Sequence, residues 1–181
     1  MSNGTQIYSG SNASIDSLYV ELSGCLDDLI KIYRSLLEVV RKEKEILVES
    51  RLDELNENNK AKDALLVRIR TLENSRMKFA RDLAVLTASD VDQPRLLEIA
   101  AKLPGERGDR LRNLHSVLEL LVRRVADVNK ANEELVQSAL RSITGAMDAI
   151  KDGLNPKPTY ERKGAMAQGK AEGGALVSRE A

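Results

Sequence analysis

Aromatic residues are nearly missing from this 181-residue chain, which has no Trp, one Phe and four Tyr. Its core therefore has to be built from Leu, Ile, Val and Ala. That composition suits helix-on-helix packing and argues against a β-sandwich, whose strands favour aromatic residues. At this length the chain forms one domain or one elongated bundle with a substantial core.

Residues with catalytic or metal-binding chemistry are also scarce. The chain has one Cys and one His, Cys25 and His115, and a metal site needs several converging ligands. The Ser, Asp and Glu residues show no spacing suited to a nucleophilic or two-carboxylate mechanism, and no Gly-rich phosphate loop is present. We therefore predict a protein with no catalytic residue, no metal and no cofactor. Cys25 lies on an apolar stripe, which predicts a small buried side chain.

Charge of one sign and long apolar runs are missing too. Lys plus Arg and Asp plus Glu number 28 each, so the formal net charge is zero. No segment is basic enough for a nucleic-acid surface, and no apolar run reaches the length of a membrane span. The polar N-terminus lacks the apolar core of a signal peptide. We expect a cytoplasmic protein that binds no nucleic acid and does not span a membrane.

Gly and Pro are confined to a few places and divide the chain. Neither occurs from Cys25 to Gln93, nor from Asp109 to Thr144. They gather around residues 94–105 and again from residue 153 onward. The pattern predicts a flexible leader at 1–13, a helical domain at 14–154 and a flexible tail at 155–181.

The predicted fold is all-α, an elongated antiparallel helical bundle or coiled coil of three long helices plus one short helix. Ser14 and Ser50 are suited to cap the first two long helices, Pro94 to open the short one and Gly153 to end the last. One continuous helix over residues 14–87 is the alternative. The broken form is favoured because a hairpin buries both apolar stripes within the chain.

The predicted last helix, residues 106–152, carries the strongest pattern. From Leu111 to Ile150 its apolar residues recur every three or four positions, which places them on one face. At about 1.5 Å per residue this helix is roughly 15 Å longer than the second one. Antiparallel packing then leaves its C-terminal end uncovered, with Ile143, Met147 and Ile150 as a binding face.

Two asparagines interrupt or border this apolar row. A buried Asn in a helix seam disfavours wrong pairings, so Asn129 and Asn132 are interpreted as register devices or, alternatively, as contacts to a partner's backbone. The candidate partner-binding residues are therefore Asn129, Asn132, Val136, Ile143, Met147 and Ile150.

Three passages resemble a known family. They are residues 36–47 followed by Leu52-Asp53-Glu54-Leu55, the run from Lys60 to Arg76, and residues 129–136. In these passages, and over most of residues 15–160, the chain resembles the FlgN family of flagellar export chaperones. The resemblance implies a cytosolic helical protein without catalytic residues. Such a protein holds hook-associated subunits and delivers them to the flagellar type III export apparatus, and it binds them through the C-terminal helical region.

Two questions stay open at the level of sequence. The last helix also suits a structural coiled coil that self-associates into a homo-oligomer. In the tail, Tyr160 is either an anchor for docking at the export apparatus or an incidental residue of a solvated segment.

Overall fold

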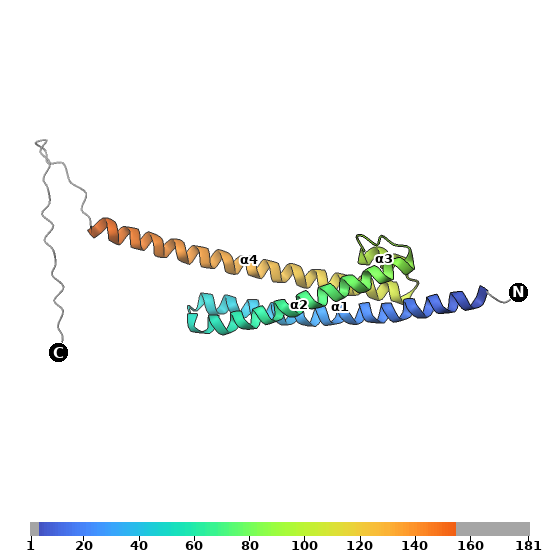
Figure 1. The fold of residues 1–181 in the computed structure, drawn as a ribbon. Coiled ribbons are helices and arrows are strands. Elements are labelled where there is room, and N and C mark those ends of the chain that lie inside the picture. Colours follow the sequence, from blue (N-terminus) through green and yellow to red (C-terminus); the bar gives the residue numbers. More distant parts are fainter. Residues whose placement is uncertain (1–3, 155–181) are drawn as a thin grey trace, which may run out of the picture. The chain divides into compact units, whose positions relative to one another are not determined.

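The computed structural model describes residues 4–154, and over that range the chain forms four α-helices and no strand (Figure 1). The helices are α1 (Gly4–Val48), α2 (Leu52–Thr87), α3 (Leu96–Lys102) and α4 (Glu106–Leu154). The predicted all-α bundle is confirmed, and its first two helices are broken rather than continuous. The chain divides into two compact units after Val136, and each is described by itself.

The core of the first unit is centred on α1. Figure 1 shows α2 running back along α1, with the first part of α4 beside them. Because neighbours lie on two sides of α1, its buried stripe is broad, as its extra apolar positions predicted. Each fully buried Leu or Ile contributes about 1.5–3 kcal/mol. Fully buried side chains of this core include Leu22, Leu26, Leu29, Val40, Leu83, Ile99 and Leu111.

The turn between α1 and α2 differs from its prediction. Ser50 was expected to cap α2, but it has a positive φ of 55° and the N-cap position belongs to Arg51. The amide of Arg51 donates to the Ile46 carbonyl at 3.0 Å and that of Ser50 to Leu47 at 3.3 Å. These two bonds form a Schellman motif, which ends α1 with a left-handed residue. Ser50 therefore terminates the first helix instead of starting the second.

Three other helix boundaries also differ from the prediction. α1 begins at Gly4 instead of Ser14, and α4 runs through Gly153 to Leu154. Once a long helix is nucleated, adding residues costs little, so an isolated Gly or a missing cap does not end it. α3 begins at Leu96 and not at Pro94. The predicted tail, residues 155–181 with Tyr160, lies outside the described residues.

Cys25 has the buried position that its apolar stripe predicted. Its Sγ lies 3.3 Å from the Leu72 carbonyl oxygen on α2, to which the thiol donates. Burial raises the pKa of this thiol, and the nearby Glu73 carboxylate raises it further. Cys25 therefore serves as a small packing residue between α1 and α2.

Among the described helices, none is long and apolar enough to cross a membrane.

Candidate partner-binding face on α4

The second unit presents large apolar side chains to solvent. In this part of α4 the exposed fractions are 58% for Ile143, 65% for Met147 and 63% for Ile150. The exposure predicted for these three residues is therefore found in the structure. Leu140 and Leu154 extend the same row and are exposed as well. We call the set Leu140, Ile143, Met147, Ile150 and Leu154 the distal seam.

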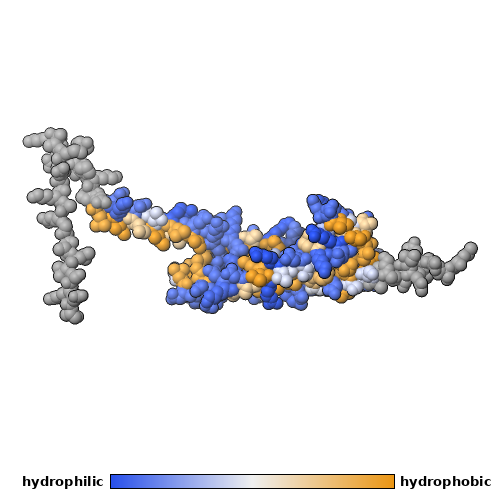
Figure 2. Space-filling view, in the orientation of Figure 1, coloured by the Kyte–Doolittle hydropathy of each residue, from blue (hydrophilic) through white to orange (hydrophobic). Residues whose placement is uncertain are grey.

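The distal seam forms a continuous surface along one side of the helix. Figure 2 shows it as an apolar band along one edge of this segment of α4. Met147, Ile150 and Leu154 line a shallow hollow together with the stem of Lys151. Scattered exposed apolar residues are normal, but a contiguous row of this kind marks an interaction surface. The flexible thioether of Met147 also lets the surface adapt to its partner.

Sequence reasoning missed two members of the distal seam, Leu140 and Leu154. The signal that identifies them is spacing, since the seam residues follow one another at steps of three, four, three and four. The predicted row runs from Leu135 through Ala139 to Ile143, so at this one point it misses the neighbouring Leu140. It also ended the helix at Gly153, so Leu154 fell outside it.

The upstream part of α4 meets a polar cluster in the first unit. Its centre is Glu43 of α1, the one residue of that helix that breaks the apolar heptad. Glu43 Oε2 accepts hydrogen bonds from Lys62 Nζ at 2.8 Å and from Asn132 Nδ2 at 3.1 Å. A third donor, Asn58 Nδ2, bonds the Val39 carbonyl at 3.2 Å. One short stretch of α1 therefore binds polar side chains from both α2 and α4, which sets the relative register of the three helices.

Three of the predicted binding residues, Asn129, Asn132 and Val136, lie in different environments. Asn132 is only 4% exposed, and its amide also donates to the Val40 carbonyl oxygen at 2.9 Å. Of the two interpretations of Asn132, these contacts favour the register device. Asn129 is half-buried and Val136 is exposed. Asn129, Asn132 and Val136 line one cleft of about 280 Å³, together with Leu47 and Leu55 and the Glu43–Lys62 pair.

We expect Asn132→Ala to lower the free energy of unfolding by about 1–2 kcal/mol, because the buried hydrogen bond to the Val40 carbonyl and the partly buried one to Glu43 are lost. The matched control is Asn129→Ala, a half-buried Asn one turn away, with an expected change within about 0.5 kcal/mol. Urea unfolding followed by circular dichroism measures both values. Equal effects from the two variants would contradict a register role for Asn132.

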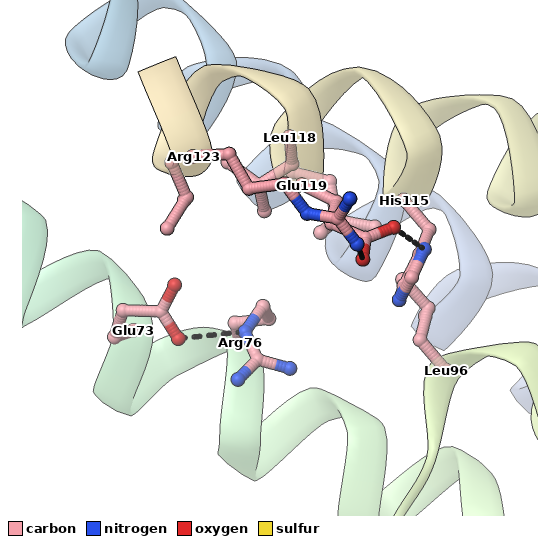
Figure 3. Close-up of a pocket in the computed structure, with 9 residues that line it drawn as sticks. Glu73, Arg76, Leu96, His115, Leu118, Glu119 and Arg123 are labelled. Atoms are coloured by element: carbon pink, nitrogen blue, oxygen red, sulfur yellow. Dashed lines mark hydrogen bonds and ion pairs between the residues drawn. The ribbon is translucent and has the colours of Figure 1, made fainter. Parts of the chain in front are cut away.

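An apolar groove lies between α2 and α4 in the first unit. Its volume is about 300 Å³, and Leu26, Leu96 and Leu118 are among its lining residues. Figure 3 shows charged side chains of α2 on one side of the groove and charged side chains of α4 on the other.

The charges of this groove are paired along each helix rather than across it. Arg76 Nε lies 2.8 Å from Glu73 Oε2, and Arg123 pairs with Glu119. His115 Nδ1 lies 4.0 Å from Glu119. Ion pairs one helical turn apart stabilise a helix only slightly. Within residues 4–154 no cluster of His, Cys, Asp or Glu is arranged to hold a metal ion.

A family model described as FlgN protein matches residues 18–168, which is most of the chain. The chain belongs to the FlgN family. Searches of curated proteins and of solved structures gave no match.

Family membership states the general role of this chain. FlgN proteins are flagellar export chaperones, and they are not known as enzymes. The chain is therefore a chaperone that binds substrates of flagellar export. The matched region includes all of α2, α3 and α4 and most of α1.

Proposed function

We propose that this chaperone binds hook-associated flagellar subunits in the cytoplasm, before their export, and that it holds them through the distal seam of α4. The observation that carries the proposal is the row of five large apolar side chains exposed on one face. A chaperone of this kind has to recognise an apolar segment of a subunit that has not yet assembled. An amphipathic helix of the subunit provides such a segment, and its apolar face packs against the seam.

The seam suits a helical ligand better than an extended one. Its spacing alternates three and four residues, which is the spacing that a second helix needs for knobs-into-holes packing. The polar positions around it include Arg141, Asp148 and Asp152, so both signs of charge border the apolar row. Of the predicted binding residues, Ile143, Met147 and Ile150 are the proposed anchors. Val136, the last residue of the first unit, precedes them at the same spacing. Asn129 is proposed as a polar contact in the cleft beside Val136.

Amide hydrogen exchange tests where the subunit binds. We expect a purified hook-associated subunit of the same flagellum to slow exchange over residues 138–154 of the chaperone, because a paired helix opens less often. Exchange in the α1–α2 hairpin should stay unchanged. Flagellin at the same concentration is the control ligand and should give no protection. Protection confined to the α2–α4 groove would place the site elsewhere and contradict the proposal.

A self-associating structural coiled coil is the second candidate function, because the seam also has the spacing of a two-stranded coiled coil. The two candidates differ in their partner, so a heterologous subunit that protects residues 138–154 favours the chaperone. Docking of the tail at the export apparatus through Tyr160 stays a prediction.

A further inference from the structure

The side-chain amide of Asn132 is only partly satisfied by the fold. Its Nδ2 donates to the Val40 carbonyl and to Glu43 Oε2, whereas its Oδ1 has no hydrogen-bond partner. Exchanging the two atoms would place an oxygen against two acceptors, so the orientation of the amide is fixed. Among the described residues, Oδ1 is the one buried side-chain nitrogen or oxygen in this state. Such an atom requires an explanation, and what it lacks is a donor.

The cleft that Asn132 lines favours a positively charged donor. Its charged lining side chains are Glu43, Glu133 and Lys62, so two carboxylates face one ammonium group. The side chain of Glu43 is only 14% exposed, and a carboxylate that is shielded from water attracts a cation more strongly than an exposed one. The volume of about 280 Å³ is at the lower limit for ligand pockets, which suits a single side chain.

The apolar part of the cleft suits a long side chain. Leu47 and Leu55 come from the two sides of the α1–α2 turn, and Val136 comes from α4. A long basic side chain packs its methylene stem on such residues while its charged end binds the polar groups. Val136 precedes Leu140 by four residues on the same helix. The cleft and the distal seam therefore follow one another along α4.

We propose that an arginine side chain of the bound subunit enters this cleft, where its guanidinium group replaces Lys62 on Glu43 and donates a hydrogen bond to Asn132 Oδ1. The inference deepens the proposed function and rests on it for the identity of the partner. In the free chaperone, Lys62 is then an internal substitute for the arginine of the subunit.

The geometry of the donors favours arginine over lysine. A guanidinium group has five N–H donors in a planar fork, so it donates to a carboxylate and to an amide oxygen at the same time. The ammonium group of Lys62 bonds Glu43 at 2.8 Å and leaves Oδ1 of Asn132 without a partner. Lys62 has a flexible stem and is 22% exposed, so its charged end moves into water when it is displaced. These contacts use side chains only and leave backbone exchange in the hairpin unchanged.

Titration calorimetry with a purified hook-associated subunit tests the exchange of cations. Glu43→Gln keeps the shape of the side chain but removes the charge that holds the arginine, so binding should weaken at least about tenfold. Lys62→Met keeps the stem but removes the competing ammonium group, so binding should tighten about threefold. The matched control is Glu134→Gln, an exposed carboxylate outside the cleft, which should leave the affinity unchanged. Circular dichroism checks that each variant is folded.

The opposite signs of the two effects are decisive, because both substitutions break the same Glu43–Lys62 pair. If that pair only holds the helices together, both variants change the affinity in the same direction or leave it unchanged. Either of these results overturns the proposal. Should Glu43→Gln fail to fold, Lys62→Met decides alone, and unchanged or weaker binding overturns the proposal.

A second measurement needs no subunit. We expect N-acetylarginine methylamide at millimolar concentration to shift the side-chain amide signals of Asn132 in NMR spectra of the full chain. The matched control is the corresponding citrulline compound, which has the same shape without the charge and should give no shift. Equal shifts from both compounds, or none because only water bonds Oδ1, refute the arginine site.

Together the two measurements separate this inference from the proposed function. A subunit that binds equally well after Glu43→Gln and Lys62→Met refutes the arginine site and leaves the distal seam as the binding site. If no hook-associated subunit binds but the arginine compound alone shifts the Asn132 signals, the proposed function is wrong. The cleft then remains a site for an arginine side chain of a different partner.

Discussion

Replacement of Ile143, Met147 and Ile150 together by Ser is expected to abolish subunit binding while leaving the fold intact. Each of these side chains is more than half exposed in the free chain, so its removal takes little from the core. In the complex each is an anchor, and truncating one anchor of an interface costs about 1–2 kcal/mol or more. The three losses together correspond to at least about a 100-fold weaker affinity.

Isothermal titration with a purified hook-associated subunit measures this loss. Because Ser has a lower helix propensity than Met, the control carries Ser at Arg141, Asp148 and Asp152 on the other faces of the same segment. We expect the control to bind and the seam variant not to bind, with similar melting temperatures. If the seam variant unfolds, the three residues belong to a core and the proposed site is wrong.

The core provides the complementary case. Leu121 of α4 is buried in the first unit, so Leu121→Ala should lower the free energy of unfolding by roughly 2–5 kcal/mol. Well below its melting temperature this variant should still bind the subunit. Together with the triple Ser variant, it separates the part of α4 that stabilises the fold from the part that we propose binds.

Gly108→Ala is expected to destabilise the chain although it replaces Gly by Ala inside a helix. In most helices that change stabilises by about 1 kcal/mol. Here a Cβ at residue 108 would lie 2.4 Å from the Ala100 carbonyl oxygen and 2.7 Å from that of Leu103. Both contacts are with backbone, so α3 or the start of α4 would have to move. Overpacking of this kind costs about 1–3 kcal/mol, occasionally more.

Gly145→Ala is the matched control for this prediction. Gly145 lies in the same helix, and a Cβ there would meet nothing within 4 Å. We expect this variant to gain up to about 1 kcal/mol, so the two substitutions should shift the urea midpoint in opposite directions. Stabilisation by Gly108→Ala would show that α3 packs less closely on α4 than the structure indicates.

Much of the helical organisation follows from the sequence alone, because it depends on local spacing. A long interval without Gly or Pro permits a helix, and apolar residues at every third or fourth position identify its buried face. Cys25, Leu22 and Leu29 could therefore be assigned to the core. The same reasoning indicated the exposure of Ile143, Met147 and Ile150, because the last helix is longer than its neighbours.

Other features depend on which helix faces which, and these only the tertiary structure decided. In the sequence Glu43 is a misfit in an apolar row, whereas in the fold it accepts hydrogen bonds from Lys62 and Asn132. Lys62 and Asn132 lie 19 and 89 positions from Glu43 in the chain, and no local pattern specifies such pairings. The same holds for Gly108, since the carbonyl groups that exclude a side chain there belong to α3 and the residue that follows it. Ser50 takes its left-handed conformation because the hairpin requires a reversal at that point, and its own side chain indicated a helix cap instead.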